Sequence, residues 1–328
     1  MLRYRTPTLA AAAAMKVQQM FTHSSSSSNK TPVWGYTQVN RLSFVDLVPR
    51  VPAREEDESS SERPHWNLPD IEKVAITHKP AEGIVDTLAY RLVRTCRWAF
   101  DTFSLYRFGS LTEQKVINRC LFLETVAGVP GMVGGMLRHL TSLRQMRRDK
   151  GWINTLLVEA ENERMHLMTF IELRQPGVVF RLSIKITQAI MYSFLLIAYI
   201  TSPRFVHRFV GYLEEEAVVT YTGILRAIDD GRLPPMKNAV PDVARVYWGL
   251  NKDATFRDLI NVIRADEAEH RVVNHTFADM HAKRLQNCVN PFVVLKTNPE
   301  LLYANAAPVA DKTMSERESG LKDGKLSH

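Results

Sequence analysis

Two short motifs in this sequence place a glutamate and a histidine three positions apart. They are Glu163-Arg-Met-His166 and Glu267-Ala-Glu-His270. Side chains at positions i and i+3 of an α-helix share one face, so each motif would present a carboxylate beside an imidazole. Both faces continue through apolar residues: Leu156, Ala160, Leu167, Phe170 and Ile171 in the first, and Phe256, Ile260, Ile263 and Phe277 in the second. Each pair is therefore predicted to point into the core, where an isolated charge is unfavourable.

Two further glutamates repeat this anomaly in other helical patterns. Glu124 follows a run of apolar residues, and Glu214 shares a face with Val210 and Val218. Four carboxylates aimed at one core would be costly to bury and would repel one another, so protons or cations must compensate them. Four negative charges balance two divalent metal ions.

One glutamate from each of two helices and Glu-x-x-His from each of two others is the ligand arrangement of ferritin-like di-metal bundles. Carboxylate and imidazole ligands suit iron or manganese better than a soft metal. A single Glu-x-x-His motif would be weak evidence for a metal site, since such a pair is usually solvated. The four segments together favour a di-metal site. A purely structural bundle would leave the four carboxylates uncompensated. The adjacent Glu215, Glu216 and Glu269 fall off these faces and are interpreted as solvated or supporting groups.

The elements that position these residues are expected to be helices. From Gly83 to about residue 285, apolar residues recur with helical spacing, interrupted by proline and glycine. No alternation of useful length predicts a strand. The fold class is therefore all-α, a four-helix bundle with additional helices. Helices are expected over residues 84–107, 112–146, 152–173, 179–201, 206–229 and 254–284.

The chain outside this region divides into tails and an arm. Residues 1–30 are basic, Ala-rich and Ser-rich without acids, which is typical of a mitochondrial transit peptide. Residues 31–80 are rich in proline and charge and are predicted to form an extended arm. Trp34 and Trp66 could attach this arm to a partner subunit or to its own domain. Residues 81–285 form the expected di-metal domain, and residues 286–328 are expected to be a polar C-terminal tail.

Charge and cysteine content exclude some functions. The formal net charge is +7, but most of the excess lies in the first 45 residues, so the folded part offers no basic surface for nucleic acid. The three cysteines, Cys96, Cys120 and Cys288, form neither a disulfide framework nor a thiolate metal motif.

Two helices are candidates for contact with a membrane surface. The apolar stretch 186–200 has only 15 residues, which is short of the roughly 20 needed to cross a bilayer, so a transmembrane span is not expected. The helix from about residue 84 carries arginines beside Leu88, Trp98 and Phe103, which is typical of a helix in a membrane interface or of an ordinary amphipathic helix.

Four segments of this chain resemble the signature segments of the alternative oxidases. The segments are Leu123-Glu-Thr125, Asn162-Glu-Arg-Met-His166, Leu213-Glu-Glu-Glu-Ala217 and Arg264-Ala-Asp-Glu-Ala-Glu-His270. The resemblance implies a cyanide-insensitive oxidase that oxidises ubiquinol to ubiquinone and reduces O2 to water. Because no spanning helix is expected, the enzyme is not expected to pump protons. It also implies a homodimer attached to one leaflet of the mitochondrial inner membrane, on the matrix side.

The same resemblance assigns site residues. It implies two iron ions held by Glu124, Glu163, His166, Glu214, Glu267 and His270, and it leaves open whether both histidines bind iron in every redox state. Tyr221 matches the family's redox-active tyrosine, although a tyrosine that merely satisfies its hydroxyl in the core is the alternative. The quinol-binding residues would be Arg97, Arg119, Leu123 and Thr220.

Two activities on a similar bundle compete with this interpretation, namely a di-iron quinone-ring hydroxylase and a ferritin-like iron-binding protein. One feature departs from the plant members of the family. No cysteine precedes Cys96, so regulation through a cysteine of the N-terminal arm is not expected, and the chain resembles the protist branch.

Overall fold

The computed structural model describes residues 66, 71–104, 106, 109–233 and 240–292. The predicted transit peptide, Trp34 with most of the arm, and nearly all of the C-terminal tail lie outside these residues. The chain divides into two compact units, and every helix below belongs to the unit that contains Ser61–Cys288.

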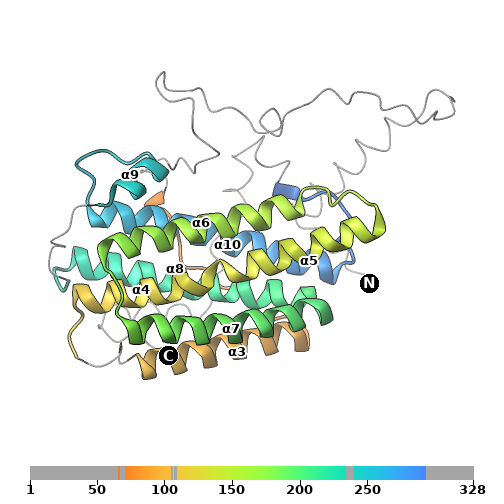
Figure 1. The fold of residues 1–328 in the computed structure, drawn as a ribbon, viewed down its shortest axis with the longest axis horizontal. Helices are drawn as coiled ribbons and strands as arrows, with labels where there is room; N and C mark the ends of the chain where they lie inside the picture. Colours follow the sequence, from red (N-terminus) through yellow and green to blue (C-terminus); the bar gives the residue numbers. More distant parts are fainter. Residues whose placement is uncertain (1–65, 67–70, 105, 107–108, 234–239, 293–328) are drawn as a thin grey trace, which may run out of the picture. The chain divides into compact units, whose positions relative to one another are not determined.

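The all-α prediction is confirmed, and no strand occurs among the described residues. Figure 1 shows long helices running side by side, with the short α9 at one end. The helices are α3 (Gly83–Phe103), α4 (Glu113–Ala127), α5 (Val129–Gln145), α6 (Trp152–Leu173), α7 (Val178–Thr201), α8 (Pro203–Asp229), α9 (Asp242–Trp248) and α10 (Phe256–Ala282).

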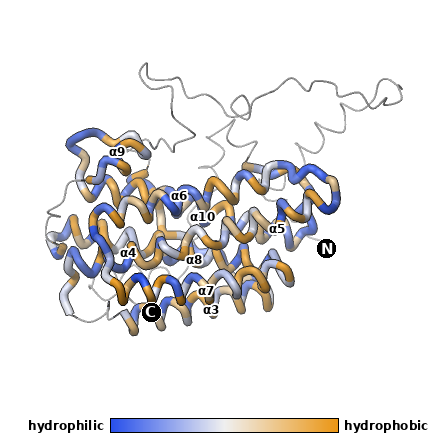
Figure 2. The backbone as a smooth tube through the Cα atoms, viewed as in Figure 1, coloured by the Kyte–Doolittle hydropathy of each residue, from blue (hydrophilic) through white to orange (hydrophobic). Residues whose placement is uncertain are grey.

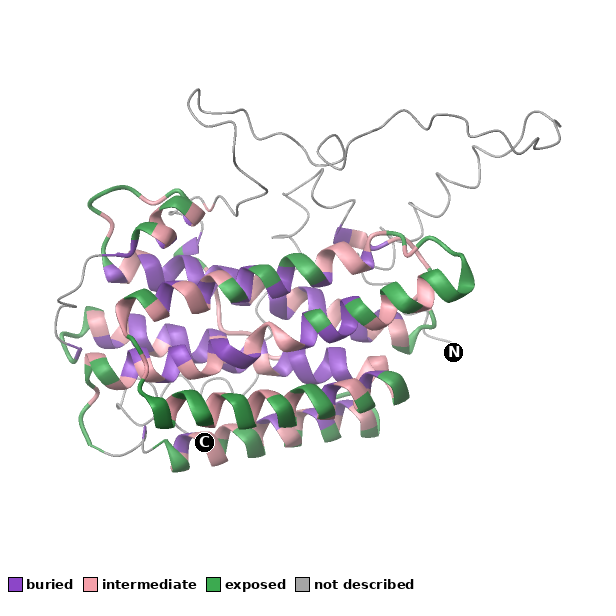
Figure 3. Ribbon diagram, in the orientation of Figure 1, coloured by how far each residue is buried: buried purple, intermediate pink, exposed green. Residues whose placement is uncertain are grey.

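Helices α4, α6, α8 and α10 form the bundle that carries the four predicted segments. Local sequence fixes where these helices begin. Thr112 caps α4 by accepting a hydrogen bond from the backbone N–H of Lys115, and Thr255 and Asp258 form a reciprocal capping box at α10. Helices α8 and α10 pack closely together, and Figure 3 shows their buried surfaces at the centre of the bundle.

The predicted helix 112–146 is wrong, because the structure divides it into α4 and α5 at Gly128. Pro130 follows in the first turn of α5 and has no N–H to continue the preceding helix. The next glycine allows α5 to approach α6 closely. A Cβ atom on Gly131 would lie 2.5 Å from the backbone oxygen of Leu156.

Residues 71–80, named here the strap, run along α8 and α10. Arg264 donates to the backbone oxygen of Ile71 at 2.9 Å, and Arg271 donates to that of Ala75 at 3.2 Å. At the other end of the strap, the Tyr212 hydroxyl donates to the oxygen of Lys79 at 3.0 Å. This part of the predicted arm therefore packs on its own domain.

Helices α3 and α7 cover the outer side of α8 and expose apolar side chains. Figure 2 shows hydrophobic residues along α7, and Figure 3 shows that many of its residues are exposed. The exposed apolar residues of the two helices include Ile84, Leu88, Trp98, Phe103, Val178, Val179, Leu182, Ile186, Ile190, Ile197 and Ile200.

The argument that no segment is long enough to cross a membrane is wrong. Helix α7 has 24 residues, from Val178 to Thr201, because it extends beyond the apolar stretch 186–200 and includes Lys185. By length and composition, two described stretches could cross a membrane, Glu113–Gln145 and Val178–Thr201. The first corresponds to α4 and α5, and 56% of its apolar window is buried, whereas 17% of the α7 window is buried.

Candidate metal centre

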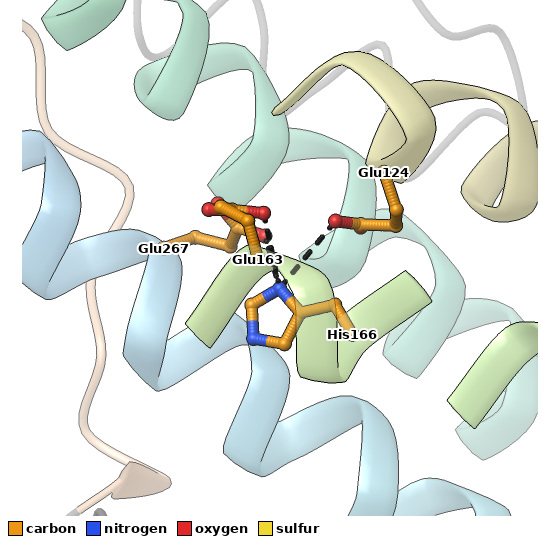
Figure 4. Close-up of side chains that lie close together, drawn as sticks. All are labelled: Glu124, Glu163, His166 and Glu267. Carbon is orange, nitrogen blue, oxygen red and sulfur yellow. Dashed lines mark ion pairs between the residues drawn. The ribbon is translucent and has the colours of Figure 1, made fainter. Parts of the chain in front are cut away.

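One imidazole nitrogen lies at the meeting point of three carboxylates from α4, α6 and α10. His166 Nδ1 is 3.5 Å from Glu124 Oε2, 3.3 Å from Glu163 Oε2 and 3.3 Å from Glu267 Oε1. Figure 4 shows these carboxylates converging on the ring. All four residues are buried, and each offers a ligand atom within 4.8 Å of the others.

A second group shares two of these carboxylates. It consists of Glu163, Glu214, Glu267 and His270, whose ligand atoms also lie within 4.8 Å of one another. His270 Nδ1 is 2.7 Å from Glu163 Oε1 and 3.9 Å from Glu267 Oε2. Glu163 and Glu267 therefore lie between the two histidines, where they could bridge two ions. All six residues that the family resemblance assigned as ligands are brought together.

The polar atoms of this cluster are better suited to binding a metal ion than to hydrogen-bonding with one another. Glu124 Oε2, both oxygens of Glu163, His166 Nδ1 and His270 Nδ1 are buried, and none makes a well-aligned hydrogen bond within the described chain, although His270 and Glu163 lie within ion-pair distance. Buried polar atoms are normally paired. A cluster of unpaired oxygens and imidazole nitrogens that face one another is the donor set that divalent iron or manganese prefers.

The electrostatics of the clustered side chains lead to the same conclusion. Burial, together with the neighbouring charge of Glu163, raises the pKa of Glu124 to about 8. Burial and the charge of Glu267 raise the pKa of Glu214 well above its ordinary value. Burial opposes a charged imidazole, but the Glu163 carboxylate outweighs it and raises the pKa of His270 to about 10. These raised pKa values mean that the clustered groups bind protons readily, and two bound cations would compensate the same negative charge.

His166 is held in orientation by a carboxylate on its far side. Its Nε2 lies 3.1 Å from Asp266 Oδ2, so the ring donates there while Nδ1 faces the metal centre. Asp266 also accepts from Asn162 Nδ2 at 2.9 Å, from Trp248 Nε1 at 2.8 Å and from Trp66 Nε1. Trp66 therefore attaches to its own domain, at a residue that supports the centre.

Tyr221 lies beside the cluster, as expected. Its hydroxyl donates to Glu124 Oε1, and the ring is 3% exposed. Burial and the Glu124 carboxylate both raise the pKa of this phenol well above its ordinary value, so the hydroxyl keeps its proton. One hydrogen bond thus joins the tyrosine to a residue of the centre.

Three of the four predicted quinol residues form a cluster between α3, α4 and α8. Arg97 Nη1 donates to Thr220 Oγ1 at 3.0 Å, and Arg97 Nε donates to Asp101 at 3.3 Å. Arg119 donates to the same Asp101 carboxylate, and its Nε is a buried donor with no partner in the described chain. The fourth residue, Leu123, is half-buried one turn beyond Arg119.

Of the two alternatives given for Glu215 and Glu216, the solvated one is wrong, because both side chains are buried. Glu215 accepts from His78 and His275 at 2.7 and 2.9 Å, and these contacts hold its pKa at about 2 although burial alone would raise it. Glu216 accepts from Arg97 at 2.9 Å. Helix α8 is enclosed on almost every side, so residues off its metal-facing side are buried as well.

Sequence reasoning also missed Glu159, Asp266 and Trp248. Glu159 is 6% exposed and lies one turn before Glu163, so its spacing could have revealed it. Burial raises its pKa to about 7, against the opposing effect of His270. Asp266 adjoins a ligand but carries no pattern of its own, and Trp248 lies on a seven-residue helix that is too short to show periodicity.

Comparison with known proteins gives consistent matches. A family model described as alternative oxidase matches residues 66–279. The chain is 81% identical over 279 residues to the mitochondrial alternative oxidase of Trypanosoma brucei brucei, and the match covers 85% of each chain. It is 43% identical over 288 residues to the protein of that name from Ajellomyces capsulatus, covering 81% of this chain and 80% of the relative. It is 45% identical over 246 residues to the protein of that name from Yarrowia lipolytica, covering 72% of this chain and 69% of the relative.

Proposed function

The chain belongs to the alternative oxidase family and is a ubiquinol oxidase, and we propose that its six clustered side chains hold two iron ions at which O2 is reduced to water. Two ubiquinol molecules supply the four electrons and four protons that convert one O2 into two water molecules. The observation that carries this assignment is the set of buried ligand atoms without hydrogen-bond partners.

Bound iron would supply the site that binds O2 and accepts electrons from ubiquinol. The chain's own residues provide the surroundings. Glu163 and Glu267 lie between the two halves of the centre, and Asp266 fixes the ring of His166. We assign Tyr221 as the redox-active residue, because its hydroxyl donates to a carboxylate of the centre. The ring could lose an electron while the hydroxyl proton moves along this hydrogen bond towards Glu124.

The quinol ring is assigned to Arg97, Arg119, Leu123 and Thr220. The buried Nε of Arg119 could donate a hydrogen bond to a quinone oxygen. Its Nη1 already donates to Asp101, which fixes the orientation of the guanidinium. Leu123 is half-buried and adjacent to Glu124, so an apolar wall at this position would place the ring beside the centre.

Attachment to one leaflet is favoured by the placement of α3 and α7. Helix α7 packs along α4, α5 and α8, which lie parallel to it in Figure 1, so a crossing helix would carry the charged bundle into the bilayer. Lying flat, the exposed apolar residues of α7 could enter the lipid while Arg181 and Lys185 reach the headgroups. A lipid-soluble quinol could then enter from the side. No spanning element moves charge across the membrane in this arrangement, so the reaction would not pump protons.

A homodimer and a mitochondrial location complete the proposal. Helices α5 and α6 expose apolar side chains that a second copy would cover: Met132, Met136, Leu140, Leu143, Leu157 and Val158. The relatives are named as mitochondrial proteins. We assign residues 1–30 to a transit peptide, 31–80 to an arm, 81–285 to the catalytic domain on the matrix side of the inner membrane, and 286–328 to a tail.

Oxygen uptake by purified, iron-loaded protein with ubiquinol, with and without cyanide, tests this function. We expect one O2 to be consumed for every two ubiquinol molecules despite cyanide, and no uptake by a folded Glu163→Ala variant. A quinone-ring hydroxylase would instead yield a hydroxylated ring. Iron binding without uptake driven by quinol would contradict the oxidase function.

A further inference from the structure

A chain of buried polar side chains runs from Glu159 through the interior of the bundle. Asn274 Nδ2 lies 2.9 and 3.0 Å from the two oxygens of Glu159, and His207 Nδ1 lies 3.1 Å from Asn274 Oδ1. The Tyr199 hydroxyl lies 3.2 Å from His207 Nε2. The four residues come from α6, α10, α8 and α7, and none is more than 6% exposed. The proposed reaction uses none of them.

The bonding pattern gives every link the same direction. Because the Asn274 amide donates to Glu159, its oxygen is left to accept, and His207 must therefore carry its proton on Nδ1. His207 Nε2 is then an acceptor, and the Tyr199 hydroxyl donates to it. Each dipole in the chain points its positive end towards Glu159, and such aligned bonds strengthen one another. Both oxygens of Glu159 accept, as suits a carboxylate.

This carboxylate is one helical turn from the ligands. Glu159 precedes Glu163 by four residues on α6, and Asn274 follows His270 by four residues on α10, which is a rise of about 6 Å on each helix. The contact between Glu159 and Asn274 thus joins α6 and α10 one helical turn away from the proposed ligands on each helix. Little solvent separates this contact from the metal centre, so a charge here acts strongly on the centre.

The charges of the proposed centre balance in only one redox state. Four ligand carboxylates neutralise two ferrous ions. In the oxidised state each iron would carry one more positive charge, and the four ligand carboxylates alone would leave two positive charges uncompensated. A fifth carboxylate nearby stabilises that oxidised state more than the reduced state. It therefore favours electron transfer from iron to O2 and lowers the reduction potential of the centre.

We propose that Glu159, ionised beside the positive charge of bound iron and hydrogen-bonded through the directed chain of Asn274, His207 and Tyr199, is the charge-compensating residue that lowers the reduction potential of the di-iron centre. The inference rests on the proposed function only in requiring that the six ligands hold iron. Glu159 acts through the electric field and touches neither iron nor quinol, so it is a positioning residue for charge.

Potentiometric titration of the iron-loaded protein tests this role. Glu159→Gln preserves the shape of the side chain and an acceptor for Asn274, but removes the charge. We expect its midpoint potential to rise, by an amount that corresponds to about a tenfold change in the redox equilibrium, and its KM for ubiquinol to stay near that of wild type, since one nearby charge commonly shifts an equilibrium by that factor. Glu159→Asp should restore the potential. The matched control is Glu161→Gln on the same helix, an exposed glutamate paired with Arg164, which should change nothing.

A second readout separates charge from packing. Loss of ferric iron to a chelator should accelerate in Glu159→Gln more than loss of ferrous iron, because the compensated state is the oxidised one. If Glu159→Gln does not retain iron, Tyr199→Phe, which removes only the last donor of the chain, should raise the potential by a smaller amount. An unchanged potential in the variant that retains iron would overturn the proposal. These measurements need no quinol turnover, so a wild-type protein that binds iron but does not oxidise ubiquinol would contradict the function and leave this test valid.

Discussion

Trp248 lies flat against His166, with ring centroids 5.7 Å apart and an angle of 21° between the planes. The same indole donates from Nε1 to Asp266, which accepts from the far nitrogen of His166. A short helix outside the four-helix bundle therefore helps to fix one ring of the metal centre. The centre depends on α9 and Trp66 as well as on the four helices that carry its proposed ligands.

Asp266→Ala should weaken iron binding, because His166 would lose the partner that fixes its orientation and tautomer. Removing such a partner commonly costs about 10- to 100-fold in metal affinity. Iron content after dialysis against graded chelator measures the effect. Asp242→Ala on α9 is the control, since that carboxylate is exposed and pairs only with Arg245 among the described contacts. Equal iron retention in both variants would show that the contact with His166 is dispensable.

Tyr221→Phe should retain iron and fold normally but lose most ubiquinol oxidase activity. The change removes only the hydroxyl that donates to Glu124, together with its capacity to give up an electron and a proton. We expect kcat to fall by about 100-fold or more, within the range of single catalytic groups. Tyr212→Phe, which loses a hydroxyl bonded to the strap, should keep nearly normal turnover. Activity retained by Tyr221→Phe would assign the tyrosine to packing.

Residues of the site could be predicted from the sequence where they interrupt the local helical pattern of apolar residues. The six proposed ligands could be predicted because each is a polar side chain on an otherwise apolar helical face, and that anomaly is visible in a single sequence. Trp66 and Asp266 could not be paired, since they are 200 positions apart and neither breaks a pattern. Glu215 was misjudged because helical spacing identifies one buried face, whereas α8 is enclosed by several neighbours. Glu159 did break the pattern, and the same criterion applied once more would have found it.

The buried His207 and the half-buried His281 should make folding stability depend on pH. Burial and the neighbouring His281 lower the pKa of His207 to about 3, and burial with Arg138 lowers that of His281 to about 4. In the unfolded chain both pKa values return to about 6.5, so below that pH the unfolded state binds more protons. Stability is complete above pH 6.5 and falls as the pH decreases towards 4, by about 1.4 kcal/mol per pH unit for each histidine.

Denaturant unfolding of the iron-loaded protein in detergent at pH 7, 6 and 5 measures this dependence. His281→Gln removes one of these groups and should make the slope below pH 6 shallower, and His275, whose pKa burial also lowers, contributes to the slope that remains. Exposed His139, whose ring is on the outer side of α5, provides the control, because His139→Gln should leave the slope unchanged. A slope unaffected by His281→Gln would mean that this ring is not held neutral in the folded protein.

Membrane attachment through α7 predicts the effect of placing charges on its exposed side. Ile190 and Ile197 are 65% and 64% exposed, and they lie seven residues apart, so they share one face of the helix. Inserting each side chain into lipid would contribute about 2 kcal/mol, and a glutamate at either position would remove that contribution and add the cost of burying a charge. Ile190→Glu with Ile197→Glu should therefore reduce partition into lipid vesicles by about 100-fold or more, measured by co-sedimentation. Val246→Glu, at a 57% exposed valine on α9, should bind like wild type. If the double variant stays on the vesicles and Val246→Glu leaves them, α9 and not α7 faces the bilayer.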